Sequence, residues 1–513
     1  RFNITGTCLP HLHYMMDNSA KLAGVMRMIE GGEYFTINRP RQYGKTTTMV
    51  ALNEVLNQSG QYRSFAMSFE GVGDLVFQDE TAFCEMFVEQ LARYTELWRT
   101  DLSQWLLDQI PTTPKFKNLS LVIGQFVQRC EAQVVLFIDE VDKSSNNQLF
   151  LSFLGMLRTK YLERHRFPTF HSVALAGVHD IKSLKLKVRS DDTAQYNSPW
   201  NIAADFEVEM SFRPHEIAPM LVEYSAAEGV AIDVDWFADK LYYYTAGYPF
   251  LVSKLCKTIA EKLVPKKTDR VWTPDDLEEA VQLLLRENNT LFDSLIKNLE
   301  NNPALYDLTY EIIINGLQMP FDPHDSIISL GRLYGVFKQN GTVKVHNRVY
   351  EQILYNYMTV RTLREQLASK PTHASYTYEK PDGSLDLERA LLRFQQFLRE
   401  QYSDKDQAFL ERQWRLIFLA FFKPILNGKG HDFKEAQSAG EKRLDVVVTY
   451  LQHKYIIELK RWYGPAYHQK GLDQLAGYLD AQGVEEGYLV IFEGEKEKSH
   501  RQEWIDHQGK RVF

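Results

Sequence analysis

The sequence predicts an α/β protein, with a parallel sheet in its N-terminal part and a separate α/β domain at its C-terminal end. Residues 134–138 form a continuous apolar run, and strand-like runs alternate with helical stretches over residues 1–215. Continuous apolar runs are typical of strands buried on both faces of a parallel sheet, and the alternation favours helices packed on that sheet. Strand-like runs at residues 443–450 and 455–460 predict the second sheet.

The N-terminal elements follow from local patterns. Residues 34–38 are β-prone and predict the first strand, and an amphipathic helix is expected at residues 46–58. The apolar run at residues 134–138 predicts a second strand, and residues 170–176 predict a third.

The middle of the chain is predicted to be helical. Residues 214–300 have a helical pattern that is interrupted by the Gly-Tyr-Pro sequence at residues 247–249, where we expect a turn. Residues 300–360 have the pattern of helices followed by a short hairpin around Asn340-Gly341, an order that suggests a winged helix. Residues 361–384 are polar and poorly periodic, which predicts a linker.

The C-terminal part is predicted to begin with helices over residues 385–422. After the two strand-like runs, a helix is expected at residues 469–481 and a strand at residues 487–492. Residues 385–513 carry equal numbers of acidic and basic side chains, so the whole net charge of −8 lies upstream. A nucleic-acid site is therefore better placed in this neutral part than in the acidic remainder.

Composition limits the class of protein. The 513 residues include 44% hydrophobic and 25% charged residues, which is typical of a globular protein rather than a disordered or collagen-like one. The 4 cysteines have no metal-ligand spacing and fit a reducing compartment. The longest apolar run, residues 416–422, is too short to span a membrane. We therefore expect a cytoplasmic protein with no membrane partner.

The loop after the first strand has the residues of a phosphate-binding loop. Such a loop needs backbone N–H groups around phosphates, a lysine for the β- and γ-oxygens and a hydroxyl for Mg²⁺. Lys45 and Thr46 supply the last two, and the helix N-terminus adds a positive dipole. Arg39 stands where the usual pattern has its first glycine, and Pro40 has no N–H. The predicted nucleotide-binding residues are Arg41, Gln42, Tyr43, Gly44, Lys45, Thr46, Thr47 and Asp139.

The strand at residues 134–138 ends in Asp139-Glu140. An aspartate at the end of a buried strand can hold Mg²⁺ together with the hydroxyl of Thr46, and the carboxylate of Glu140 can orient the attacking water. These residues predict a protein that binds ATP with Mg²⁺, with hydrolysis resting mainly on Glu140.

Several segments together resemble the AAA-ATPase-like family of bacterial proteins, in which Arg-Pro-Arg commonly replaces the first glycine of the loop. The resemblance spans roughly residues 5–360, and it implies a P-loop NTPase sheet with a helical lid and a winged helix. It also implies that residues 177–180 sense the γ-phosphate, although a polar loop without that role is an equal alternative. The segments that carry the resemblance are residues 13–15, 38–46, 138–142, 198–202, 247–250 and 346–350.

An arginine that stabilises charge during hydrolysis cannot be chosen from the sequence. Arg41, Arg158 and Arg213 are the candidates, and for each of them the role of a surface or paired residue is favoured over the catalytic one.

A second cluster of charged residues lies near the C-terminus. Asp445 opens the apolar part of one predicted strand, and Glu458 lies in the next. Lys460 shares the face of Glu458 because side chains alternate along a strand. Two carboxylates and the Leu459 carbonyl would form a hard oxygen site for Mg²⁺ or Mn²⁺. With a lysine nearby, this set suits metal-assisted phosphodiester hydrolysis.

The helix that follows carries Gln474 and Tyr478, four residues apart on one face. With Asp445, Glu458 and Lys460, they resemble the PD-(D/E)XK nuclease superfamily, specifically the RecB-like branch with its Gln-x-x-x-Tyr helix, over about residues 385–500. The resemblance implies metal ligation by the two carboxylates, catalytic support by the lysine and an orienting role for Gln474 and Tyr478. It also implies a helix acid, for which Glu411 is the candidate and Glu435 a weaker one.

The whole architecture is similar to a bacterial family that pairs this ATPase type with this nuclease type. The pairing implies an association with defence or mobile elements. The predicted domains are a P-loop AAA-like ATPase domain at residues 1–215, a helical lid at 216–300, a winged helix at 301–360, a linker at 361–384 and a PD-(D/E)XK nuclease domain at 385–513.

Three functions fit these features. The first is an ATP-gated, Mg²⁺-dependent nuclease, with DNA as its favoured substrate. The second is an ATP-dependent regulatory switch whose C-terminal domain binds nucleic acid without cutting it. The third is a toxin directed at RNA, since the metal chemistry is shared between DNA and RNA. A homo-oligomer is compatible with each of them.

Overall fold

The structure is a computed structural model of the chain. It describes residues 1–141, 148–177, 200–314, 317–367, 378–401, 430–433, 446–450, 453–462, 464–493 and 501–513, together with residues 414–415, 417–419, 421–422 and 425–426. The chain divides into two compact units. The first comprises Arg1–Asn298 and Phe321–Gln339, and the second comprises Leu299–Pro320 and Asn340–Phe513.

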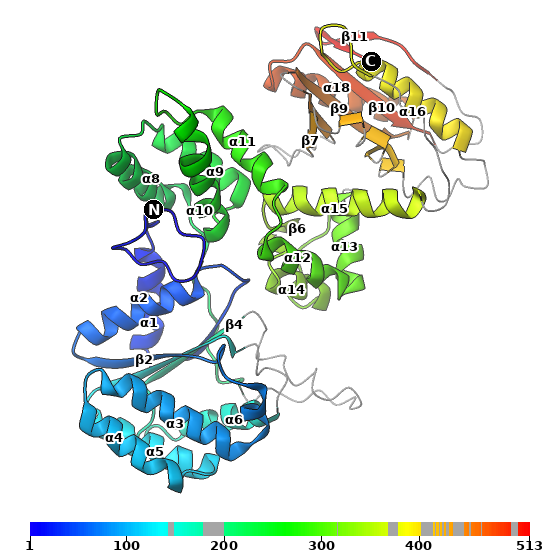
Figure 1. The fold of residues 1–513 in the computed structure, drawn as a ribbon. Helices are drawn as coiled ribbons and strands as arrows, with labels where there is room; N and C mark the ends of the chain where they lie inside the picture. The colour runs from blue at the N-terminus through cyan, green and yellow to red at the C-terminus, as the bar shows by residue number, and fades with distance from the viewer. Residues whose placement is uncertain are drawn as a thin grey trace. The chain divides into compact units, whose positions relative to one another are not determined.

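The first unit contains a parallel four-stranded sheet, as the sequence predicts (Figure 1). Its strand order is β1-β4-β3-β2, and every neighbouring pair is parallel. A further parallel bridge joins Phe35 to Ala204 at the outer edge of β1. The strands are β1 (Tyr34–Asn38), β2 (Tyr62–Ser68), β3 (Gln133–Asp139) and β4 (Ser172–Gly177).

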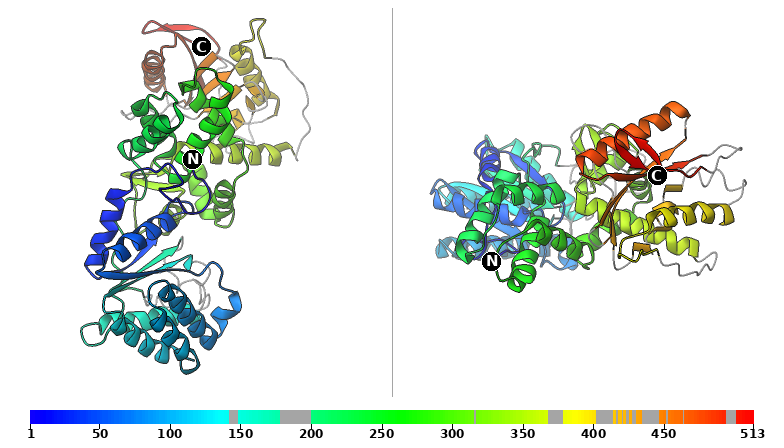
Figure 2. Two further views of the ribbon diagram at one scale, coloured as in Figure 1. Left: turned by 60° about the vertical axis from the view of Figure 1, so that its left-hand side comes forward. Right: turned by 90° about the horizontal axis from the view of Figure 1, so that it is seen from above.

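Helices cover both faces of this sheet, and Figure 2 shows the two layers from further directions. Because side chains alternate along a strand, Leu136 and Ile138 of β3 face one layer and Val135 and Phe137 face the other. The first layer consists of α3 (Glu80–Glu96), α4 (Thr100–Gln109), α5 (Phe116–Arg129) and α6 (Gln148–Leu162), with the short helices η1 (Asp74–Gln78) and η2 (Ile110–Thr112). The second consists of α1 (Ser19–Glu30) and α2 (Lys45–Gln58).

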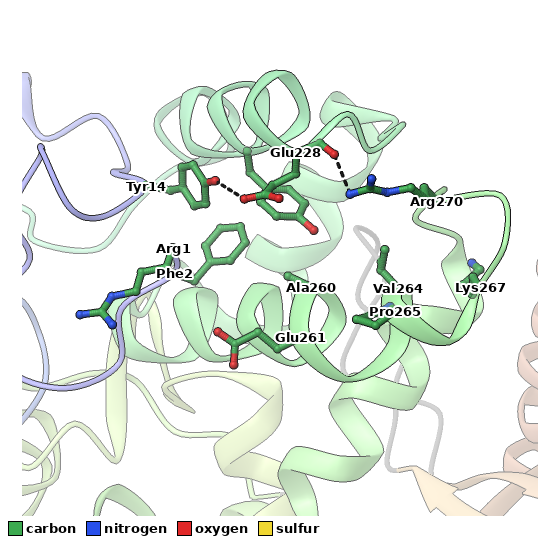
Figure 3. A pocket seen from close by; sticks show the side chains of 11 residues that line it. Arg1, Phe2, Tyr14, Glu228, Ala260, Glu261, Val264, Pro265, Lys267 and Arg270 are labelled. Carbon is green, nitrogen blue, oxygen red and sulfur yellow. Dashed lines mark hydrogen bonds between the residues drawn. The ribbon is translucent and has the colours of Figure 1, made fainter.

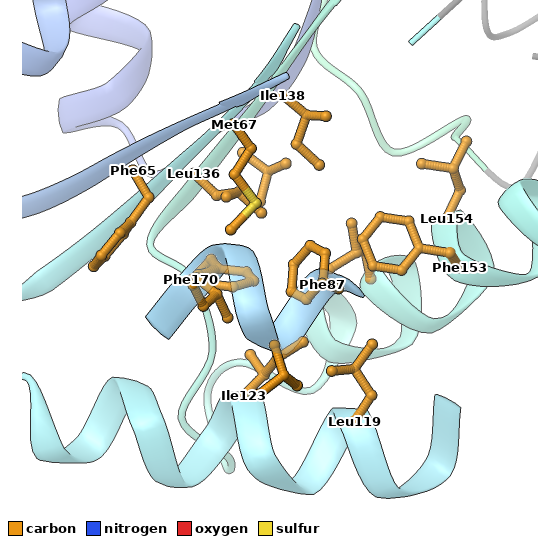
Figure 4. Packing of buried hydrophobic residues seen from close by; sticks show 14 of the residues in the cluster. Phe65, Met67, Phe87, Leu119, Ile123, Leu136, Ile138, Phe153, Leu154 and Phe170 are labelled. Atoms are coloured by element: carbon orange, nitrogen blue, oxygen red, sulfur yellow. The ribbon is translucent and has the colours of Figure 1, made fainter. Parts of the chain in front are cut away.

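The larger of the two cores lies between the sheet and the first layer (Figure 4). Phe65, Leu136 and Ile138 point from the strands toward Phe87 of α3 and Ile123 of α5, and all five side chains are buried. The continuous apolar run of β3 is therefore explained by burial on both faces of the sheet, and this burial holds the end of the strand in place.

The helical segment that follows breaks where the sequence predicts. Ala246 and Gly247 both have positive φ angles, and Pro249 takes the first position of the next helix. A buried ion pair of 2.7 Å between Lys21 and Glu216 joins α1 to the first of these helices. The helices are α8 (Pro214–Glu228), α9 (Val234–Thr245), α10 (Pro249–Thr258), η5 (Ile259–Leu263), η6 (Val264–Lys266), α11 (Pro274–Leu285) and α12 (Thr290–Glu300).

The segment expected to form a winged helix is divided between the two units. α14 (Ser326–Leu333) belongs to the first unit, whereas α13 (Pro303–Ile313) and α15 (Arg348–Leu367) belong to the second. Two short strands, β5 (Phe337–Asn340) and β6 (Thr342–Val345), lie on either side of Gly341, where the sequence predicts a hairpin. α15 continues to Leu367, so the first part of the expected linker at residues 361–384 is helical.

The second unit contains a six-stranded sheet of order β11-β12-β10-β9-β8-β7. β7, β8 and β9 are antiparallel neighbours, whereas β10 is parallel to β9 and reaches it through the crossover helix α18. The elements are α16 (Leu387–Gln401), β7 (Gly430–Phe433), β8 (Val446–Tyr450), β9 (His453–Arg461), α18 (Pro465–Ala481), β10 (Glu486–Phe492), β11 (Ile505–His507) and β12 (Lys510–Val512).

The predicted strands at residues 455–460 and 487–492 are confirmed by β9 and β10. The predicted helix at residues 469–481 begins earlier, at Pro465, because a proline at the first helical position needs no hydrogen-bond acceptor and favours helix initiation. Across the described ranges, none of the helices combines the length and the apolar character that a membrane crossing requires.

We predict that Gly247→Ala destabilises the first unit strongly. A Cβ atom at residue 247 would lie 2.0 Å from the carbonyl oxygen of Phe212, and the backbone has a φ of +73° that L-residues rarely adopt. Gly229→Ala is the matched control, because its φ is +62° but no atom lies within 4 Å of the added carbon.

Thermal unfolding of the two variants separates the clash from the backbone strain. In both variants the free energy of unfolding should fall by roughly 1–2 kcal/mol, the cost of the left-handed conformation for an L-residue. Gly247→Ala should in addition have a distinctly lower Tm than Gly229→Ala. Equal Tm values would contradict the packing of this turn against Phe212.

Candidate functional site

The candidate nucleotide site lies at the carboxyl end of β1, in the loop that leads into α2. Gly44 precedes the helix with a φ of 82°, in the left-handed region that only glycine adopts at little cost. Lys45 and Thr46 form the first turn of α2. The strand, loop and helix therefore occur in the order that a phosphate-binding loop requires.

The ammonium group of Lys45 is held inside the loop. Its Nζ donates to the carbonyl oxygens of Arg39 and Pro40, each at 2.9 Å, and the residue is only 7% exposed. The positive charge therefore lies at the centre of the loop, surrounded by the backbone that would cradle a phosphate.

Thr46 and Asp139 meet across the sheet. The hydroxyl of Thr46 donates to Oδ2 of Asp139 at 2.5 Å, and the Asp139 carboxylate is 6% exposed at the end of β3. Its other oxygen accepts the backbone N–H of Glu140 at 2.9 Å. Glu140 has a φ of 55°, an uncommon backbone conformation for this residue type that often marks functional sites.

The helical segment contacts the loop through the Gly-Tyr-Pro turn. The hydroxyl of Tyr248 donates to the carbonyl oxygen of Arg41, and its ring packs edge-on against the ring of Tyr43 at 4.6 Å. Burial raises the pKa of Tyr43. The side chain of Tyr43 therefore packs between the loop and the turn, which leaves its backbone N–H as the group that could meet a phosphate.

The start of the loop is held by two structural contacts. Arg39 donates to the carbonyl oxygen of Val208 at 2.8 Å and lies over the ring of Phe206, and its burial lowers the pKa of the guanidinium. Pro40 packs so closely on Gly335, after α14, that a Cβ there would lie 2.6 Å from the proline ring. The two residues that depart from the usual glycine pattern thus have packing roles.

The remaining predicted residues of the loop are distributed around it. Arg41 and Gln42 are exposed, and the hydroxyl of Thr47 accepts the backbone N–H of Cys8 at 3.2 Å. Of the other candidate arginines, Arg158 lies in α6 and Arg213 precedes α8. Residues 142, 178–180 and 198–199 lie outside the described residues.

Two cavities of the first unit lie away from the loop. One, of about 440 Å³, is lined by residues of the N-terminal segment and of α8, η5 and η6 (Figure 3). In it the hydroxyl of Tyr14 donates to Glu228 at 3.0 Å, and burial together with this carboxylate raises the pKa of Tyr14 to about 12. The other, of about 740 Å³, lies between α1 and residues 205–216. Neither contains a residue of the phosphate-binding loop.

The second predicted site lies in the sheet of the second unit. Glu458 is fully buried in β9, and Nζ of Lys460 lies 2.7 Å from its Oε1. The contact agrees with the expectation that the two side chains share one face of the strand. A carboxylate with no solvent exposure is costly to ionise, and the lysine supplies the compensating charge.

The register of β8 and β9 is relevant to Asp445, the second predicted carboxylate of this site. Val446, the residue after Asp445, is paired with Ile457, the residue before Glu458. β8 and β9 are antiparallel neighbours. Asp445 itself, and likewise Glu411 and Glu435, lie outside the described residues.

α18 covers the face of β9 that carries Glu458 and Lys460. A Cβ added at Gly471 would lie 3.5 Å from the stem of Lys460. Gln474 is three residues further along the same face and half-buried, whereas Tyr478 is buried in the core between α18 and the sheet. The structure thus places the predicted Gln-x-x-x-Tyr helix over the predicted lysine.

The carbonyl oxygen of Leu459, predicted as a metal ligand, accepts a hydrogen bond from Nη2 of Arg415 at 3.0 Å. Among the residues that the structure describes, no group of three or more His, Cys, Asp or Glu side chains is placed to hold a metal ion. Glu458 is the one predicted carboxylate ligand of the second site that falls within these ranges.

Sequence reasoning missed three contacts that shape these sites. The Gly-Tyr-Pro turn is visible in the sequence, but its hydrogen bond to Arg41 is not, because the two segments are far apart in the chain. The packing of Gly335 on Pro40 and the bond from Arg415 to Leu459 likewise leave no local pattern.

An uncharacterized WD repeat-containing protein of Synechocystis sp. is 25% identical over an alignment of 356 residues that covers 64% of this chain. The chain spans about 28% of that relative's length.

Solved structures resemble the chain at low sequence identity. A Walker-type ATPase of Pyrococcus abyssi has a TM-score of 0.47 and 11% identity, covering 69% of this chain and 99% of its own. The ORC2 protein of Aeropyrum pernix has a TM-score of 0.37 and 10% identity, covering 67% of this chain and 94% of its own.

One protein family matches the part of the chain that contains the phosphate-binding loop and the helical segment. Residues 11–356, well over half of the chain, match the AAA-like domain family. This range contains the parallel sheet, the phosphate-binding loop with Lys45, and the Gly-Tyr-Pro turn that contacts it. The chain therefore belongs to the AAA-like domain family.

Proposed function

We propose that residues 1–360 bind and hydrolyse ATP with Mg²⁺, and that this activity controls a Mg²⁺-dependent nuclease in residues 385–513. The observation that carries the first part is the contact between Thr46 and Asp139 beside the buried ammonium of Lys45. The observation that carries the second is the buried pair of Glu458 and Lys460 beneath α18.

Lys45 is suited to bind the β- and γ-phosphates. Its ammonium is held by two uncharged carbonyl oxygens, which are weaker partners than phosphate oxygens because a bond between two charged groups is stronger. We infer that ATP draws the ammonium off the carbonyls of Arg39 and Pro40. The backbone N–H groups of residues 41–46 then surround the phosphates.

The donor chemistry of Thr46 and Asp139 fits Mg²⁺. Both supply hard oxygen atoms, and these atoms already lie within hydrogen-bond distance of each other. Bound there, Mg²⁺ would offset the negative charge of the phosphates. Glu140, directly after Asp139, is the residue that we assign to orient the attacking water.

The Gly-Tyr-Pro turn offers a route by which nucleotide binding could reach the helical segment. Tyr248 bonds to the loop at Arg41, so a change in the loop alters a contact of α10 as well. This contact supports a role for α8–α12 as a lid that responds to the nucleotide.

The nuclease proposal is supported by burial and register. Glu458 is 0% exposed, and Lys460 beside it is 19% exposed, so the pair lies at the boundary between the core and the surface. Val446, the first residue of β8, is paired with Ile457, the residue before Glu458. We propose that Asp445, the residue before Val446, completes the pair of carboxylates.

The donor set of this site also fits a divalent ion. The carboxylates of Asp445 and Glu458 are the oxygen ligands that Mg²⁺ and Mn²⁺ prefer. When bound, the ion would polarise a phosphodiester bond. Lys460 would hold charge or water near the reacting group, and Gln474 and Tyr478 would orient it. DNA is the favoured substrate, and a regulatory domain that binds without cutting, or an RNA nuclease, are the other outcomes of the tests.

We predict that Lys45→Ala abolishes measurable ATP binding, with a loss of about a hundredfold or more, because the phosphates lose a buried cationic partner. Isothermal titration with ATP and Mg²⁺ checks this. Lys262→Ala, which removes an exposed lysine from the helical segment, is the matched control and should bind like the wild type. Unchanged affinity in Lys45→Ala would refute the nucleotide site.

We predict that Asp445→Asn and Glu458→Gln each remove Mg²⁺-dependent cleavage of DNA but leave ATP turnover unchanged. The amides keep the volume of the side chains but lose the charge that binds the ion. Glu486→Gln is the control, because Glu486 also pairs with a cation in the same sheet, at 2.7 Å from Arg511, but lies in β10.

Plasmid, single-stranded DNA and RNA are incubated with each variant, with and without ATP and Mn²⁺. Loss of both activities together would contradict the model of two separate sites. Retained cleavage in Glu458→Gln would remove this residue from the nuclease.

A further inference from the structure

We propose that the surface immediately after β9 binds unpaired nucleotides of a nucleic-acid strand, beside the pair of Glu458 and Lys460. This inference rests on the nuclease proposed above and names the form of nucleic acid that its site would receive. The surface, called here the aromatic-basic surface, consists of Arg461, Trp462, Tyr467, His468 and Lys470.

The aromatic-basic surface adjoins the candidate nuclease site through the chain itself and through packing. β9 carries Lys460 and ends at Arg461, and α18 begins at Pro465. Gly471, which follows Lys470 in α18, lies against the stem of Lys460. A strand bound along the first turns of α18 would therefore pass close to the ammonium of Lys460.

Aromatic rings are exposed or half-buried on this surface. Tyr467 lies in the first turn of α18 and is 41% exposed. Trp462 is half-buried. The ring of Trp462 lies 5.9 Å from the ring of His468, so two flat side chains are neighbours on this surface. Exposed rings bind the faces of bases when these faces are not already stacked in a duplex, which favours unpaired nucleotides.

The charge of the surface fits a phosphate backbone. Residues 461–472 contain Arg461 and Lys470 and not a single Asp or Glu. Lys470 is exposed. Acidic groups also lie near this surface: Glu503 pairs with Arg501 at 2.5 Å, Asp473 of α18 pairs with His507 at 2.7 Å, and Glu493 follows Phe492, whose backbone is paired with that of Arg461. Basic groups interleaved with aromatic rings are typical of proteins that bind single strands.

Backbone hydrogen bonds position the residues that carry these rings. The N–H groups of Tyr467 and His468 both donate to the carbonyl oxygen of Gly464, at 3.1 and 3.2 Å. The N–H of Trp462 donates to Phe492 of β10 at 2.8 Å. Strand pairing and the first turn of α18 therefore position the backbone of these residues before a nucleic acid binds, which limits the backbone entropy that binding would cost.

The test measures binding of fluorescently labelled oligonucleotides to the full chain in EDTA, where metal-dependent cleavage cannot occur. Single-stranded DNA, single-stranded RNA of the same sequence and a DNA duplex form the three arms. Tyr467→Ala should weaken binding of the single strands by about tenfold, which is the usual effect of removing one stacking ring. Tyr467→Phe, which keeps the ring, should bind like the wild type.

Tyr243→Ala is the matched control, because Tyr243 is a 43% exposed tyrosine on α9 of the other unit. It should leave oligonucleotide binding unchanged. Circular dichroism of each variant shows that the fold is retained. A loss of affinity confined to the DNA arm or to the RNA arm would identify the type of nucleic acid that the surface prefers. A loss of affinity in both arms would show that the surface recognises stacked bases without distinguishing DNA from RNA.

Equal affinity of Tyr467→Ala and the wild type for the single strands would overturn the inference, as would a wild type that does not bind them. Addition of Mn²⁺ to the same samples distinguishes this result from a failure of the proposed function. Binding that depends on Tyr467 without any cleavage would support the surface and refute the nuclease. Cleavage that does not respond to Tyr467→Ala would support the nuclease and refute the surface.

Discussion

The ammonium group of Lys45, buried in its loop and bonded to the carbonyls of Arg39 and Pro40, is the interaction on which the nucleotide site depends. A buried cation needs compensating oxygen atoms, and the loop supplies them from its own backbone. The packing of Pro40 on Gly335 and the bond from Tyr248 to Arg41 hold that backbone in place. The site is thus preorganised by contacts that reach α14 and α10.

Two buried lysine–carboxylate pairs in the chain have the same length but different surroundings. Lys21 and Glu216 lie 2.7 Å apart with the lysine 4% exposed, and Glu216 also caps α8, so the pair joins two helices. Glu458 and Lys460 also lie 2.7 Å apart, but Lys460 reaches the surface beside α18. A buried pair is costly to break, so the closed Lys21–Glu216 pair has a structural role, whereas Lys460 remains accessible from solvent.

The sequence predicts the strands of both sheets best where burial is simplest. β3 is buried on both faces and reads as an apolar run, whereas β2 mixes polar and apolar residues and gives a weaker signal. The triad of Lys45, Thr46 and Asp139 is predictable because strand order brings the carboxyl ends of parallel strands together. The contact of Gly335 with Pro40 is not predictable, since it joins segments almost three hundred residues apart whose sequences carry no complementary pattern.

A crystal structure of the full chain with Mg²⁺ and a non-hydrolysable ATP analogue tests the central claim most directly. We expect Nζ of Lys45 to leave the carbonyl oxygens of Arg39 and Pro40 and to lie within hydrogen-bond distance of phosphate oxygens, with the Thr46 hydroxyl and the Asp139 carboxylate beside the ion. An analogue bound elsewhere, with Lys45 still on the two carbonyls, would contradict the claim.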